Sequence, residues 1–110
     1  MTYELAKQLK EAGWPQVFEY GARFYDGGYD DHWERVWIDG MLRERADKTC
    51  VVKPTLEQLI KACGKHLFEL TNFEEEGWEA HSLTVLSQKG DTPDEAVARL
   101  WLAIFKPLDN

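Results

Sequence analysis

Three segments of the chain place apolar residues at helical spacing. In residues 93–105 the apolar positions recur at i, i+3, i+4 and i+7, which puts them on one face of a helix: Val97, Leu100, Trp101 and Ile104. Thr92 is a typical N-cap, Pro93 suits the first helical position, and Glu95 completes the usual start of a capped helix. This pattern predicts a helix over 93–105 that the rest of the chain must cover.

Two earlier segments follow the same rules. Residues 3–12 carry an apolar stripe of Leu5, Leu9 and Ala12, and Gly13 is a suitable stop. Residues 55–63 begin with Thr55 and Gln58, which form the sequence signature of a capping box. Cys63 falls on the apolar face of this second helix, and we therefore expect a buried thiol.

Alternating apolar and polar residues predict strands over 17–25, 34–38, 66–73 and 77–86, with a further short strand at Val51–Val52. The glycine-rich or acidic turns between them favour hairpins. At 110 residues, with no linker or repeat, the chain is expected to form one domain, 1–110, of the α+β class. We predict three helices packed on a small, mainly antiparallel sheet.

The same patterns predict the core. The expected buried side chains are Leu5, Leu9, Phe18, Phe24, Val36, Trp37, Leu56, Leu59, Ile60, Phe68, Leu70, Trp78, Val97, Leu100, Trp101 and Ile104. Tyr20 is also expected in the core, and Trp14 is expected to fold back against the first helix.

The charge balance restricts the partners. Thirteen basic and 20 acidic residues give a net charge of −7, and the basic residues are spread along the chain. Such a chain is repelled by nucleic acids and anionic lipids, so neither is an expected partner. The acidity serves solubility or forms a face that docks on a basic protein. Two cysteines, no signal sequence and no long apolar run predict a reduced, cytoplasmic protein that does not cross a membrane.

The first predicted hairpin carries the densest polar group, which consists of Asp26, Asp30, Asp31, His32 and Glu34. The aromatic residues Tyr29 and Trp33 lie close to it in sequence. Carboxylates next to His32 could ligate a cation, but their spacing does not match a calcium loop, so we expect a solvated acidic loop and no metal. Tyrosine and tryptophan anchor many interfaces. The predicted binding surface therefore consists of Asp26, Tyr29, Asp30, Asp31 and Trp33.

Catalytic chemistry has one weak candidate. Cys63 lies close to His66 in sequence, and His81 could face His66 across the second hairpin. A cysteine–histidine pair can form a nucleophile, but a helix C-terminus disfavours a thiolate. The chain contains no phosphate loop, no Cys-x-x-Cys and no Gly-x-Ser-x-Gly motif, and no cofactor is expected.

Four blocks of the chain, in this order, resemble a group of small uncharacterised bacteriophage and prophage proteins. The blocks are residues 4–15 (ELAKQLKEAGWP), 54–64 (PTLEQLIKACG), 77–80 (GWEA) and 90–103 (GDTPDEAVARLWLA). The resemblance implies a phage-related origin and no particular activity. Residues 78–104 also resemble HicB-type antitoxins, which have a partial RNase-H-like fold, although the first half of the chain lacks the strands of that family.

Three functional hypotheses follow. The first is a non-enzymatic accessory protein that binds a host or phage protein through an acidic, aromatic surface. The second is an antitoxin-like regulatory module, which predicts a homodimer. The third is a small-ligand binder or an enzyme that uses His66, His81 or Cys63.

Overall fold

The computed structural model describes residues 1–26, 34–37 and 50–105. Within these segments the three predicted helices are confirmed as α1 (Tyr3–Glu11), α3 (Leu56–Cys63) and α4 (Pro93–Phe105). A short 3₁₀ turn, η1 (Gly64–His66), follows α3. The capping box of α3 is present, with Thr55 and Gln58 each satisfying the other's backbone N–H group. The predicted α+β class is confirmed.

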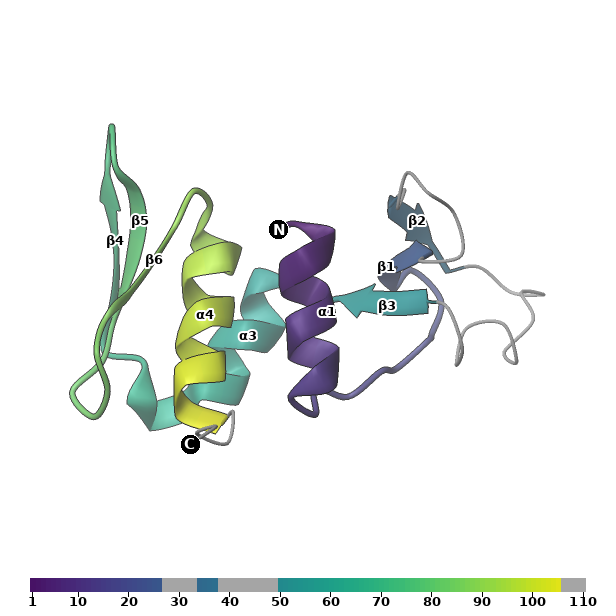
Figure 1. Cartoon of the computed structure of the whole chain (residues 1–110), viewed down its shortest axis with the longest axis horizontal. Helices are drawn as coiled ribbons and strands as arrows, with labels where there is room; N and C mark the ends of the chain where they lie inside the picture. The colour runs from purple at the N-terminus through teal and green to yellow at the C-terminus, as the bar shows by residue number, and fades with distance from the viewer. Residues whose placement is uncertain (27–33, 38–49, 106–110) are drawn as a thin grey trace.

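In the described residues the strands form two antiparallel sheets of three strands each, where a single sheet was predicted. One has the order β2-β1-β3 and consists of β1 (Arg23–Asp26), β2 (Glu34–Val36) and β3 (Cys50–Lys53). The other has the order β4-β5-β6 and consists of β4 (Glu69–Phe73), β5 (Gly77–His81) and β6 (Gln88–Gly90). Both predicted hairpins are present, whereas β6 lies outside the predicted strands. The helices lie between the two sheets (Figure 1).

The main core lies between the helices and the β4-β5-β6 sheet. Its fully buried side chains include Leu9, Leu59, Val97 and Leu100. The β6 strand runs very close to the first turn of α4: a Cβ atom at Gly90 would lie 2.5 Å from the backbone nitrogen of Ala96. Glycine therefore permits the contact between this sheet and this helix.

The β2-β1-β3 sheet is covered on both faces. On one face, Phe24 packs with Phe18 and Trp37, with ring centroids 5.2–6.0 Å apart in this trio. On the other face, Tyr25 and Val51 pack against α1 and its flanking residues. Because α1 also contributes Leu5 and Leu9 to the main core, this helix joins the two halves of the molecule.

Eight of the 17 predicted core residues are buried: Leu5, Leu9, Phe24, Trp37, Leu59, Val97, Leu100 and Trp101. Five more are partly buried against the clusters: Phe18, Leu56, Leu70, Trp78 and Ile104. The prediction was wrong for Val36, Ile60, Phe68 and Tyr20, which are exposed.

Two of these errors have a clear physical reason. The N–H of Phe68 donates to the carbonyl of His81, and Glu69 pairs with the same residue. Two residues of one chain segment thus face one residue of β5, as in a β-bulge, and the alternation of side chains is interrupted there. Tyr20 lies in a turn closed by a hydrogen bond from the N–H of Ala22 to the carbonyl of Glu19, outside any strand.

Candidate functional site

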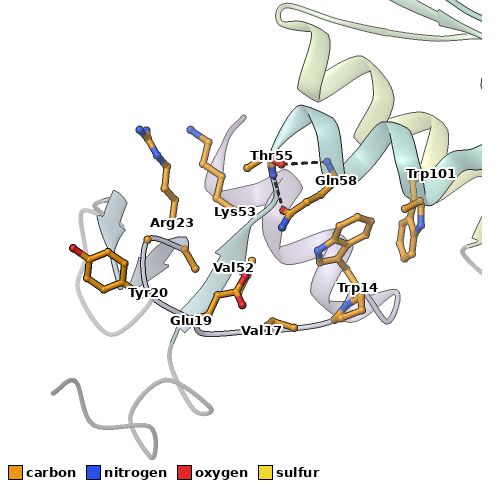
Figure 2. Close-up of a pocket in the computed structure, with 14 residues that line it drawn as sticks. Trp14, Val17, Glu19, Tyr20, Arg23, Val52, Lys53, Thr55, Gln58 and Trp101 are labelled. Carbon is orange, nitrogen blue, oxygen red and sulfur yellow. Dashed lines mark hydrogen bonds between the residues drawn. The ribbon is translucent and has the colours of Figure 1, made fainter. Parts of the chain in front are cut away.

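A groove of about 500 Å³ lies where the connection between α1 and β1 passes the ends of β3 and α3. Figure 2 shows Trp14 and Trp101 side by side at one end of this groove and Tyr20 and Arg23 at the other. We call it the aromatic groove. Its lining comprises residues 14, 15, 17, 19–23, 52, 53, 55, 58, 62 and 101.

Aromatic and aliphatic side chains form most of the walls. The rings of Trp14 and Trp101 meet edge to face, with centroids 5.1 Å apart, and both residues are buried. Val17 and Tyr20, by contrast, are 56% and 76% exposed. Large apolar side chains that stay accessible beside a hollow are typical of a surface that binds another molecule.

The connection between α1 and β1, which forms one wall of the groove, is held in place by side-chain hydrogen bonds. The Oε1 atom of Gln16 accepts from the N–H of Val52 at 2.8 Å, and the Nε2 atom of Gln16 donates to the carbonyl of Trp14 at 3.0 Å. Trp14 folds back as predicted, and its N–H donates to the carbonyl of Leu9. The groove is therefore formed by the folded chain itself rather than by a loosely attached loop.

Charged groups mark the rim next to β1 and β3. Glu34 accepts hydrogen bonds from Arg23 at 3.0 Å and from Lys53 at 3.2 Å. Burial opposes ionisation of Glu34, but these two hydrogen bonds and cations outweigh it and lower the pKa of the carboxyl group. Both basic groups at the rim are thus already engaged with a carboxylate.

The polar groups on the α3 side are also engaged. The N–H of Gln58 donates to the Thr55 hydroxyl at 3.1 Å, and the N–H of Thr55 donates to Oε1 of Gln58 at 2.9 Å (Figure 2). These groups stabilise the start of α3, so the apolar walls remain the part of the groove that offers the most to a ligand.

The candidate nucleophile is placed unfavourably for catalysis. Cys63 is buried, its Sγ atom lies 3.8 Å from the carbonyl oxygen of Val97, and burial raises the pKa of the thiol to about 11. A thiol with this pKa is protonated at neutral pH and is a poor nucleophile.

The two histidines have separate partners. Nδ1 of His66 lies 2.9 Å from the Thr84 hydroxyl, whereas Nδ1 of His81 lies 3.4 Å from the Ser87 hydroxyl and 4.0 Å from a Glu79 oxygen. In residues 1–26, 34–37 and 50–105, no group of three or more His, Cys, Asp or Glu side chains is placed to hold a metal ion.

The predicted binding surface of the first hairpin lies mostly outside the described residues. This applies to Tyr29, Asp30, Asp31 and Trp33. The backbone of Asp26 ends β1, where it pairs with Cys50. Sequence reasoning missed the aromatic groove; the available signal was Gly21, which has a φ of +87° and interrupts the strand pattern assumed for residues 17–25.

The fold and the groove together define an α+β protein with an apolar hollow between its two halves. Among the described segments, no helix has the length and apolar character needed to cross a membrane. Comparisons with protein-family models, with curated proteins and with solved structures give no match to this chain.

Proposed function

We propose that this protein is a non-enzymatic protein-binding module that receives apolar side chains of a partner protein in the aromatic groove. The observation that carries this proposal is the exposure of Val17 and Tyr20 along a groove whose other end is formed by the buried Trp14–Trp101 pair. An interface of this kind combines accessible anchors with a rigid base, which limits the entropy lost on binding.

The chemistry of the surroundings supports binding over catalysis. The basic groups at the rim, Arg23 and Lys53, are paired with Glu34, and the thiol of Cys63 is buried with a pKa of about 11. The overall charge of −7 favours a partner with a basic surface around its apolar anchor. From the resemblance of residues 4–15, 54–64, 77–80 and 90–103 to small bacteriophage and prophage proteins, we further propose a cytoplasmic accessory protein of phage or prophage origin whose partner is a host or phage protein.

The test is affinity capture from nuclease-treated bacterial lysate, with wild-type protein compared with Tyr20→Ala and Val17→Asp. Removing an aromatic anchor from an interface costs about 2 kcal/mol or more, which is roughly a 30-fold loss of affinity. A partner that binds through the groove is captured by the wild type and lost with both variants. Leu86→Ser, which changes an exposed apolar side chain in the β5–β6 loop, is the matched control and retains the partner.

The size of the groove favours one alternative, a small-molecule site. A hollow of about 500 Å³ falls within the range of known ligand pockets. If no captured protein depends on Tyr20, a thermal-shift screen of metabolites distinguishes the two functions. A compound that raises the melting temperature of the wild type but not of Val17→Asp establishes the small-molecule site and refutes the protein-binding proposal.

A further inference from the structure

The two sheets protect some of their edges with side chains. At the outer edge of β3, the Nζ atom of Lys10 donates to the carbonyl of Cys50 at 3.1 Å, and Gln16 accepts from the N–H of Val52. At β6, the Nη1 atom of Arg99 donates to the carbonyl of Lys89 at 2.6 Å. Side chains that occupy edge peptide groups in this way prevent another strand from pairing there.

The outer edge of β4 has no such cover. In the described part of the chain, no group from outside the β4–β5 hairpin forms a hydrogen bond with the backbone of Glu69–Phe73. Figure 1 shows β4 at the side of the molecule that faces away from the helices, with the tip of its hairpin beyond the first turn of α4. Alternate N–H and C=O groups of this five-residue strand are therefore available to an added strand.

Side chains around this edge indicate what such a strand would carry. Phe68, directly before β4, and Phe73, its last residue, are 62% and 42% exposed. Glu69, Glu74 and Glu75 add exposed carboxylates at the start of the strand and in the turn that follows it. The edge thus combines free peptide groups, two aromatic contacts and negative charge.

The charges argue against a second copy of this chain as the occupant. In an antiparallel pair of β4 strands, Glu69 of each copy would lie beside the acidic turn of the other copy. Like charges that face each other across a strand pair are destabilising. A basic segment of a different protein avoids this repulsion and satisfies the carboxylates.

We propose that the edge of β4 binds an extended, lysine- or arginine-rich segment of a partner protein as an added strand of the β4-β5-β6 sheet. Backbone hydrogen bonds would supply affinity, and the contacts with Phe68, Phe73 and the carboxylates would supply specificity. This surface is independent of the aromatic groove.

The test selects, from a display library of short random peptides, those that bind the full wild-type chain. We expect the enriched peptides to be basic and β-prone, and their binding to shift the amide NMR signals of residues 69–73. Glu69→Lys combined with Glu74→Lys weakens binding about tenfold or more, because two attractive contacts become repulsive. Glu11→Lys, a charge reversal at the exposed end of α1, is the matched control and leaves the affinity unchanged.

A second measurement uses only the wild-type protein, so its result does not depend on whether the Glu69→Lys, Glu74→Lys variant folds. Methylating alternate backbone nitrogens of a selected peptide removes strand hydrogen bonds without changing its charge, and it abolishes binding if the peptide adds to the sheet. Equal affinity after methylation, signal shifts outside β4, or a homodimer joined through β4 would each overturn the proposal. Tyr20→Ala does not affect this binding, so the result is separate from that for the groove.

Discussion

The close approach of β6 to α4 makes Gly90→Ala the most informative single substitution. A Cβ atom at this position would lie 2.5 Å from the backbone nitrogen of Ala96, and 2.8 Å and 2.9 Å from two atoms of Glu95. Ordinary contacts between such atoms are about 3.5–4.0 Å, so the strand and the helix must separate by roughly 1 Å. Two of the three obstructing atoms belong to the helix backbone, which cannot yield by changing a rotamer.

The cost follows from what that separation would disturb. The first turn of α4 contains Asp94 and Glu95, whose carboxylates lie 3.2 Å and 3.6 Å from the amino group of Met1. The same helix buries Val97 and Leu100 completely. Overpacking a core costs about 1–3 kcal/mol, and because the backbone itself obstructs the methyl group we expect the upper part of that range. For a domain of this size the melting temperature should fall by on the order of 10 °C.

Urea denaturation followed by tryptophan fluorescence measures this free energy directly. Lys89→Ala, at the exposed neighbouring position, is the control and should change stability by less than about 0.5 kcal/mol. If Gly90→Ala is as stable as the control, then β6 does not approach α4 as closely as described, and the account of this part of the core is refuted.

Three further substitutions or treatments test other parts of the fold. Trp101→Ala should reduce the free energy of unfolding by about 3–5 kcal/mol in urea titrations, since a large buried ring is lost; a cost below about 1 kcal/mol would contradict its place in the core. Burial opposes ionisation of Asp94, but the hydrogen bond with Thr92 and the amino group of Met1 outweigh it and lower the pKa of this carboxyl group below its ordinary 3.8. The ionised Asp94 carboxylate therefore stabilises the fold above pH 3.8, and this contribution is lost as the pH falls through the lower pKa of the folded state. In urea titrations at a series of pH values, the difference in the free energy of unfolding between wild type and Asp94→Asn should disappear over that interval. A difference that does not vary with pH would refute this role. Cys63 should be alkylated by iodoacetamide at pH 8 about tenfold or more slowly in the native state than in urea, as measured by peptide mass spectrometry, because its thiol is buried; equal rates would contradict that burial.

The helices could be predicted from sequence because their signals are local. Thr55 and Gln58 identify the start of α3 within four residues of chain, and the apolar spacing of residues 93–105 identifies the buried face of α4. The division into two sheets could not be predicted in the same way. Which strands share a sheet depends on contacts between distant segments, such as that between β1 and β3. The short strand β6 has no apolar alternation at all, and its position depends on the fit of Gly90 against α4.

The aromatic groove was missed for a related reason. Its lining comes from separate stretches of chain, between Trp14 and Trp101, and no stretch contains a pattern that indicates a hollow. Tyr20 is aromatic and lies at the same alternate positions as Phe18 and Phe24, which is the pattern of a core residue. Only the turn at Gly21 directs its side chain to the surface. The interaction of Gln16 with Val52, which holds the wall in place, joins residues 36 positions apart.

The position of α1 has a consequence for how binding and stability are linked. One wall of the groove is attached to the β2-β1-β3 sheet and the other, with Trp101, to the main core, and α1 packs against both. A partner in the groove would therefore connect two regions that can otherwise open with different free energies. A partner would stabilise the β2-β1-β3 sheet against opening by a free energy that rises with the logarithm of the partner concentration above Kd, and the amide protons of β1 and β3 would exchange at rates proportional to the unoccupied fraction of the groove.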